Sequence, residues 1–166
     1  MDKGEIIVGV ETNKPQMSYY NDYGDLTGFD IEFAEAVTSK LGLDIVFKEI
    51  DWNEKEDELN SKNIDCIWSS MTVTEERRKI FEFSSVYINN RQVVVIRRED
   101  AFKFPDAESF IHAKMAAGSS TTGEEALLGN PYLSQSDYTN MASQNDAVVA
   151  LKNGECDGIV IDYTLA

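Results

Sequence analysis

The sequence predicts a two-lobed α/β protein in which each lobe is a mostly parallel sheet flanked by helices. Three observations lead to this fold class. Strand-like and helix-like segments alternate through residues 6–69, a similar helix–turn–strand segment occurs in each half, and polar residues follow an apolar strand in both halves. A chain of 166 residues has room for one domain or two small ones.

The first half is predicted to follow the order β-α-β-α-β. A polar loop over residues 13–28 separates the first strand from the first helix, which Asp30 is expected to cap and Gly42 to end. This order implies parallel strands with right-handed crossovers. The predicted strands and helices lie in turn at residues 6–10, 31–41, 44–50, 53–60 and 64–69.

The second half repeats the alternation with shorter segments. Helices are expected to begin at two capping boxes, Thr122 with Glu125 and Ser143 with Asp146, and a short helix is expected to open at residues 105–108. Strands are predicted at residues 92–96, 114–118, within 132–141 and at 158–161.

Residues 59–72 (LNSKNIDCIWSSMT) and 151–164 (LKNGECDGIVIDYT) are the similar segments of the two halves. Each runs from a helix end through a Lys-Asn turn to an apolar strand that ends in polar residues. Open α/β sheets bind ligands at the carboxyl ends of their strands. We therefore predict lobe 1 over residues 1–88, lobe 2 over residues 89–166, and a hinge at about residues 84–92.

The composition narrows the classes of ligand. A net charge of −15 argues against nucleic acid and acidic membranes, since both need a cationic face. No apolar run approaches the roughly 18 residues of a membrane-spanning helix. The two cysteines, Cys66 and Cys156, have no paired spacing, and His112 is the only histidine, so we expect no metal and no cofactor. A small zwitterion or cation remains possible, because a local arginine can bind its carboxylate.

The first candidate site is a hydroxyl-rich run before a paired arginine. Ser70 and Thr72 follow a predicted strand, and Thr74 is expected to start a helix that also carries Arg77. Backbone N–H groups, a helix dipole and a guanidinium would together bind a carboxylate. The alternative is an ordinary cap by Thr74 with solvated arginines, and Arg78 is assigned to solvent in either case.

A second hydroxyl and glycine cluster spans residues 118–123, with Ser120, Thr121 and Thr122 ahead of a helix. It lacks the lysine of a phosphate-binding loop, and its alternative is a flexible capped loop. Asp162 ends an apolar strand and is either an acceptor for an ammonium group or a solvated strand end. No nucleophile has an ordered base, so reversible binding fits better than turnover.

Two further residues follow predicted strands. Glu11 follows the first strand, with the same ambiguity as Asp162, and Trp52 follows the second. An indole there either stacks on a ligand or belongs to the core.

Most of the chain resembles the extracellular solute-binding proteins of polar amino-acid ABC transporters, which have the periplasmic binding protein type 2 fold. The resemblance rests on residues 24–37 (GDLTGFDIEFAEAV), 50–87, 90–96 (NRQVVVI), 118–123 and 146–162 (DAVVALKNGECDGIVID), in the family's order.

The resemblance implies roles for the candidate residues of both lobes. Arg77 would bind the ligand's α-carboxylate in lobe 1, with Ser70 and Thr72 contacting its carboxylate and ammonium groups. Glu11 and Trp52 would face the ligand side chain. In lobe 2 the loop formed by Ser120, Thr121 and Thr122 would close on the carboxylate. Asp162 would accept hydrogen bonds from the α-ammonium group.

A receptor of this kind binds a small polar amino acid between its lobes and delivers it to a membrane permease. The N-terminus, where Met1 is followed closely by a predicted strand, fits either a cytoplasmic protein or an exported one whose signal was replaced by a starting Met. The resemblance implies the second, a protein that works outside the cytoplasmic membrane, and it implies that the protein is not an enzyme. The alternatives are a cyclohexadienyl dehydratase-like enzyme on the same scaffold, for which Glu11 is the obvious acid, and the ligand-sensing module of a signalling receptor.

Two features depart from the family pattern. The family continues beyond the strand that ends at Asp162, whereas this sequence ends at Ala166. We therefore expect an incomplete second lobe and uncovered apolar surface, either in a fragment or beneath a partner chain or oligomer. Lys14 stands where the family often has an aromatic or small apolar residue, which makes the side-chain specificity hard to predict.

Overall fold

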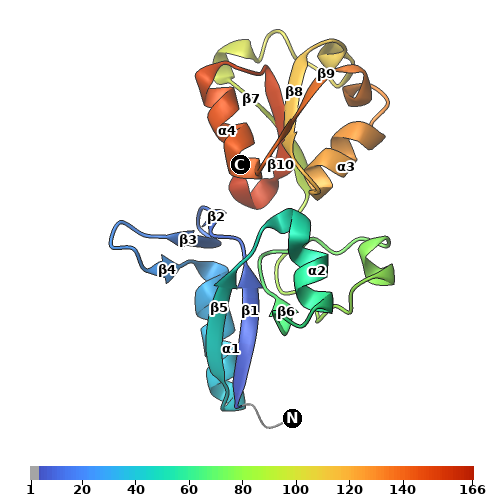
Figure 1. The fold of residues 1–166 in the computed structure, drawn as a ribbon. Helices are drawn as coiled ribbons and strands as arrows, with labels where there is room; N and C mark the ends of the chain where they lie inside the picture. The colour runs from blue at the N-terminus through green and yellow to red at the C-terminus, as the bar shows by residue number, and fades with distance from the viewer. Residues whose placement is uncertain (1–3) are drawn as a thin grey trace. The chain divides into compact units, whose positions relative to one another are not determined.

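The computed structural model of the protein describes residues 4–166, and the chain divides into two compact units, Met1–Ile88 and Asn89–Ala166. Both units are α/β, with strands and helices coloured along the chain in Figure 1. Among residues 4–166, no helix has the length and apolar character needed to cross a bilayer.

The first unit is built on a three-stranded parallel sheet of order β5-β1-β6. Strands β1 (Glu5–Val10) and β5 (Asp44–Glu49) pair over six residues each, from Glu5 opposite Asp44 to Val10 opposite Glu49. Strand β6 (Cys66–Ile67) pairs over only two residues and is shorter than predicted. The predicted acidic helix is a 3-10 turn, Trp52–Glu54, followed by α2 (Lys55–Asn60).

The polar segment 13–28 is not the plain loop that the sequence predicts. Strands β2 (Asn13–Lys14), β3 (Ser18–Tyr20) and β4 (Leu26–Thr27) form a small antiparallel sheet. Strands of two or three residues are too short to produce a readable alternation of apolar and polar positions, so the prediction missed them.

Helix α1 (Phe29–Leu41) begins differently from the prediction. Gly28 precedes it with φ 121°, and a Cβ at this position would lie 2.4 Å from the carbonyl oxygen of Met17, so only glycine fits. Asp30 lies inside the first turn and caps nothing, because its carboxylate accepts hydrogen bonds from Ser70 and Tyr87. The predicted end is confirmed, since Gly42 adopts the left-handed conformation.

The second unit has a four-stranded sheet of order β7-β10-β8-β9. Strand β10 (Gly158–Asp162) runs antiparallel to β7 (Gln92–Ile96) and parallel to β8 (Lys114–Gly118), which also pairs in parallel with β9 (Asp137–Met141). The prediction of a mostly parallel sheet in this half is confirmed, with β7 as the antiparallel edge.

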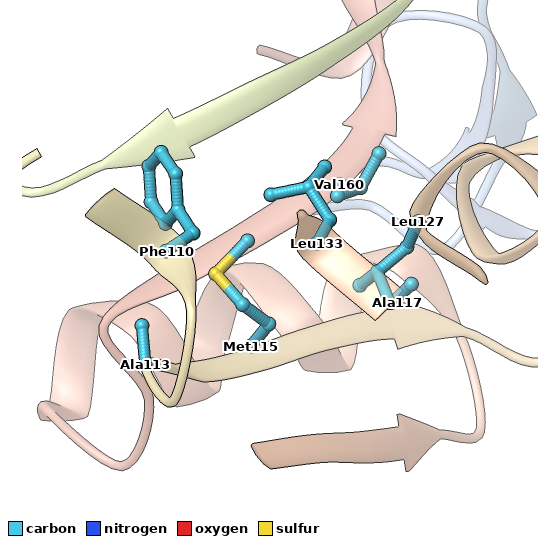
Figure 2. Close-up of a cluster of buried hydrophobic side chains, with 7 residues drawn as sticks. All are labelled: Phe110, Ala113, Met115, Ala117, Leu127, Leu133 and Val160. Atoms are coloured by element: carbon cyan, nitrogen blue, oxygen red, sulfur yellow. The ribbon is translucent and has the colours of Figure 1, made fainter. Parts of the chain in front are cut away.

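Helices α3 (Thr122–Gly129) and α4 (Gln144–Asn153) pack against the two faces of this sheet. Alternate residues of a strand point to opposite faces. Met115, Ala117 and Val160 accordingly join the cluster beneath α3, whose side chains Figure 2 draws, while Ala116 and Ile159 join the cluster beneath α4.

The two predicted capping boxes have different outcomes. Ser143 caps α4 as predicted, since its Oγ accepts a hydrogen bond from the backbone N–H of Asp146. The cap of α3 is Thr121 rather than Thr122, with its Oγ1 accepting from Glu124 N, one residue earlier than predicted. The short helix expected at residues 105–108 is a 3-10 turn at Glu108–Phe110.

Candidate functional site

Arg77 is a buried cation of the first unit, with 7% of its surface exposed. Its Nη1 donates a hydrogen bond to the carbonyl oxygen of Thr72 at 3.0 Å, which fixes the guanidinium against the chain leaving β6. Arg78 is exposed, as the sequence predicts. The predicted alternative of two solvated arginines is therefore wrong for Arg77.

The prediction of a helix starting at Thr74 is also wrong. Thr74 Oγ1 accepts from Arg77 N at 3.2 Å, but only a single 3-10 turn, Arg77–Lys79, follows. The next residues alternate in burial, with Phe81 buried between exposed Ile80 and Glu82, which is an extended rather than a helical pattern. Anion binding at this site would therefore depend on the guanidinium and on local backbone N–H groups.

Ser70 belongs to a buried hydrogen-bond network that the sequence did not reveal. Its backbone has φ 49°, and its hydroxyl donates to one carboxylate oxygen of Asp30. The hydroxyl of Tyr87 donates to the other oxygen at 2.8 Å. Asp30 therefore orients Ser70, a role hidden because an aspartate at a helix start resembles a cap.

The Asp30 carboxylate is destabilised by its surroundings. Burial raises the pKa of Asp30 above its ordinary value of 3.8, although hydrogen bonds from Ser70 and Tyr87 and the charge of Lys14 oppose the shift. Burial likewise raises the pKa of Tyr87, and the neighbouring Asp30 carboxylate adds to that shift.

This network makes the stability of the protein depend on pH. Because the pKa of Asp30 is higher in the folded state than in the unfolded chain, its protonation favours folding below pH 3.8, and this contribution is lost as pH rises through the folded-state pKa. We expect the free energy of unfolding of the wild type, relative to Asp30→Asn, to fall across that window and then to stay level.

Urea midpoints of both proteins between about pH 3.5 and 7 measure this difference. Tyr87→Phe should move the window to higher pH, because it removes a hydrogen bond that stabilises the carboxylate. If the free energy of unfolding of the wild type relative to Asp30→Asn rises with pH, the raised pKa assigned to Asp30 is contradicted.

Glu11 and Trp52 meet around Lys14, which is 6% exposed. Lys14 Nζ lies 2.8 Å from Glu11 Oε2 and donates to the carbonyl oxygen of Ser69 at 2.9 Å. It also lies 4.6 Å from the centroid of the Trp52 ring. Trp52 is buried, so its indole packs against the lysine within the unit.

Asp162 is a buried acid of the second unit, with 5% of its surface exposed. One carboxylate oxygen accepts from Asn90 Nδ2 and the other from Gln144 Nε2, both at 2.6 Å. Gln144 Oε1 in turn accepts from Asp162 N at 2.7 Å. Asp162 is therefore not a solvated strand end, and sequence reasoning missed both amide side chains that hold it.

The hydroxyl loop lies beside this acid. Gln92, paired with Asp162 across β7 and β10, donates from Nε2 to Thr122 Oγ1. Thr121 donates to the Gly118 carbonyl at 2.7 Å, and the backbone of Ser120, with φ 55°, donates to Glu124. The loop is thus held by its own hydrogen bonds. Within residues 4–166, the buried Oε1 of Gln92 has no hydrogen-bond partner.

The first unit also contains an apolar groove of about 610 Å³. Trp68, Met71, Phe81 and Phe83 contribute to its lining, and none of the candidate ligand residues does. Ile80, which also lines the groove, is more than half exposed.

Both cysteines are free thiols. Burial raises the pKa of Cys66 to about 11 and also raises that of Cys156, so neither is a reactive thiolate. Among residues 4–166, no group of three or more His, Cys, Asp or Glu side chains has an arrangement that could hold a metal ion.

Comparison with known proteins identifies relatives over nearly the whole chain. The L-cystine-binding protein TcyJ of Escherichia coli is 28% identical over 165 residues, which cover 99% of this chain and 61% of that protein. The ABC transporter glutamine-binding protein GlnH of Bacillus subtilis is 28% identical and is covered to 60% of its length. The chain therefore spans about three fifths of the length of these relatives.

Solved structures give the same result. An ancestral arginine-binding protein bound to arginine matches with a TM-score of 0.92 at 28% identity, covering 99% of this chain and 73% of that one. The ancestral amino acid-binding protein AncCDT-1, a precursor of cyclohexadienyl dehydratase, matches with a TM-score of 0.92 at 27% identity, covering 98% and 71%. The two-lobed periplasmic-binding-protein fold predicted from the sequence is thus confirmed.

Residues 6–165 match the family described as bacterial extracellular solute-binding proteins, family 3. This match covers nearly all of the residues whose fold and candidate sites are described above. The chain belongs to the bacterial extracellular solute-binding proteins, family 3.

Proposed function

We propose that the protein binds an amino acid zwitterion and delivers it to the permease of an ABC transporter. The observation that carries this proposal is a pair of buried, opposite charges, Arg77 in the first unit and Asp162 in the second. Each is held by hydrogen bonds from or to its own unit, so each is pre-organised for a ligand group of the opposite sign.

The α-carboxylate is assigned to Arg77, with Ser70, Thr72 and the loop Ser120–Thr122 as further donors. A planar guanidinium can donate two parallel hydrogen bonds to a carboxylate, which makes arginine the preferred partner. Ser70 directs its hydroxyl proton to Asp30, so it would contact the ligand through its backbone or as an acceptor.

The α-ammonium is assigned to Asp162. An ammonium group has three N–H donors, and the partnerless Oε1 of Gln92, next to Asp162 in the sheet, is a second acceptor of the kind it needs. A ligand whose carboxylate binds Arg77 and whose ammonium binds Asp162 would stabilise the conformation in which both residues contact it. In this proposal the permease recognises that ligand-bound conformation.

We place the protein outside the cytoplasmic membrane, in the periplasm or on a lipid anchor, in keeping with a family of extracellular proteins. The amino acids named for its relatives, cystine, glutamine and arginine, define the class of ligand proposed. A sensory module with the same fold is the alternative that shares this ligand class.

An enzyme on the same scaffold is the other alternative, since one structural neighbour is a precursor of cyclohexadienyl dehydratase. The acid considered for that chemistry is Glu11, whose carboxylate is ion-paired to Lys14 at 2.8 Å. The Lys14 ammonium therefore already engages the carboxylate that this chemistry would use. This contact supports binding without turnover.

We further propose that the apolar groove of the first unit is covered by another polypeptide, a partner chain or a second copy in an oligomer. Its support is the size of the groove and the aromatic side chains that line it, because exposed apolar surface of this kind marks an interaction site. A light-scattering mass equal to that of a lone chain would count against an oligomer.

A thermal-shift and calorimetric panel over the twenty amino acids and cystine tests the proposed function. A ligand present at 100 times its Kd should stabilise the folded protein by about 2.7 kcal/mol, and therefore raise the melting temperature by several degrees. If no amino acid shifts the melting temperature or gives a heat of binding, the proposal fails.

A further inference from the structure

Lys14 is a buried cation that the general site does not explain. Lysine is almost never buried without a partner, and the Lys14 ammonium has a full set. It pairs with Glu11 at 2.8 Å, donates to the Ser69 carbonyl at 2.9 Å and lies over the Trp52 ring at 4.6 Å. These four residues come from three separate segments of the first unit, since Glu11 and Lys14 are only three residues apart, so the fold itself assembles the cluster.

The cluster adjoins the proposed carboxylate-binding segment. Ser69 directly precedes Ser70, and its hydroxyl accepts the backbone N–H of Glu11 at 3.1 Å, so one residue ties Glu11 and Lys14 to the chain that carries Arg77. Glu11 and Trp52 are the residues expected to face the ligand side chain. Lys14 therefore contacts both residues of the proposed side-chain subsite.

The charges decide what this subsite can accept. With Lys14 paired to it, Glu11 no longer presents a net negative charge to a ligand, and a second cation would approach the Lys14 ammonium as closely as the carboxylate. The protein as a whole carries a net charge of −15, which attracts cations. Selection against a cationic side chain therefore requires a local positive charge, and Lys14 supplies one.

We propose that Lys14 determines specificity by neutralising Glu11, so that the protein binds amino acids with uncharged side chains and rejects those with cationic ones. This inference rests on the proposed function. It makes glutamine and cystine the probes of the accepted class, and arginine and lysine the probes of the rejected class.

Titration calorimetry with these four amino acids tests the inference. The wild type should bind glutamine or cystine at least 10-fold more tightly than arginine or lysine. Lys14→Met keeps a long side chain but removes the cation paired with Glu11, so the affinity for arginine should rise at least 10-fold relative to the better of glutamine and cystine. Lys55→Met is the matched control, because Lys55 also lies over the Trp52 ring, at 4.8 Å, and should leave the preference unchanged.

A second variant keeps the inference testable if Lys14→Met does not fold. Glu11→Gln leaves the Lys14 ammonium without its counter-ion, so arginine should bind still more weakly relative to the uncharged ligand. A wild type that prefers arginine, or an unchanged preference in both variants, would overturn the role of Lys14 while leaving amino-acid binding intact. If the wild type binds none of the four and no other amino acid, the proposed function itself is wrong.

Discussion

Arg77→Ala should weaken amino-acid binding by at least about 30-fold while the protein remains folded. Removing one partner of a buried, hydrogen-bonded charge pair costs about 2 to 5 kcal/mol, and each 1.4 kcal/mol is a factor of ten in Kd. Arg77 is the buried guanidinium of the first unit, and Thr72 holds its Nη1 in place. Titration calorimetry against the best ligand of the amino-acid panel measures the loss.

The neighbouring arginine provides the control for this prediction. Arg78 is exposed and lies 5.8 Å from the Phe83 ring centroid, so Arg78→Ala should leave Kd within about twofold. Arg77→Lys keeps the charge but loses the planar fork, and we expect an intermediate Kd. Circular dichroism melting separates lost binding from lost folding. Unchanged affinity in a folded Arg77→Ala protein would refute the carboxylate assignment.

Asp162→Asn should weaken binding of the same ligand by about 100-fold, because the proposed ammonium partner loses its charge. The substitution also disturbs the unit, since the carboxylate accepts from Asn90 and Gln144 at once and an amide has only one oxygen. We therefore expect a lower melting temperature as well. Calorimetry at a temperature well below both melting transitions isolates the effect on binding.

A ligand lacking the α-amino group separates the charge effect from the structural one. The wild type and Asp162→Asn should bind this analogue equally weakly, because the interaction that the variant removes is absent from it. Asp137→Asn, at an exposed position of β9 in the same unit, serves as the matched control and should bind the complete amino acid as the wild type does. If Asp162→Asn weakens binding of the analogue as much as it weakens binding of the amino acid, the ammonium assignment is contradicted.

The order of strands and helices was largely predictable, because it depends on local sequence patterns such as apolar runs and helix-ending glycines. Strands β1, β5, β7, β8 and β10 have continuous apolar runs or clear boundaries, and Gly42 ends helix α1 where the sequence predicts. Prediction failed where elements were short. The three strands within residues 13–28 and the 3-10 turn at Arg77–Lys79 have too few residues for a period to show.

The candidate residues were predictable mainly through their resemblance to a family. The residue types and their order marked Arg77 and Asp162, but a bare pattern left each with a solvated alternative. Burial decided between the two, since both side chains are almost fully enclosed. The supporting residues Asp30, Asn90, Gln92 and Gln144 were missed because amides and a helix-start aspartate have no distinctive spacing.

The sequence by itself determined the two-lobed α/β fold, the absence of paired cysteine spacing and the candidate charged residues. Only the tertiary structure decided which groups those charges contact. Lys14 is three residues from Glu11, but Ser69 and Trp52 reach it from distant segments through the pairing of β1 with its neighbours. Contacts between segments far apart in the chain depend on how sheets assemble, and local patterns do not encode them.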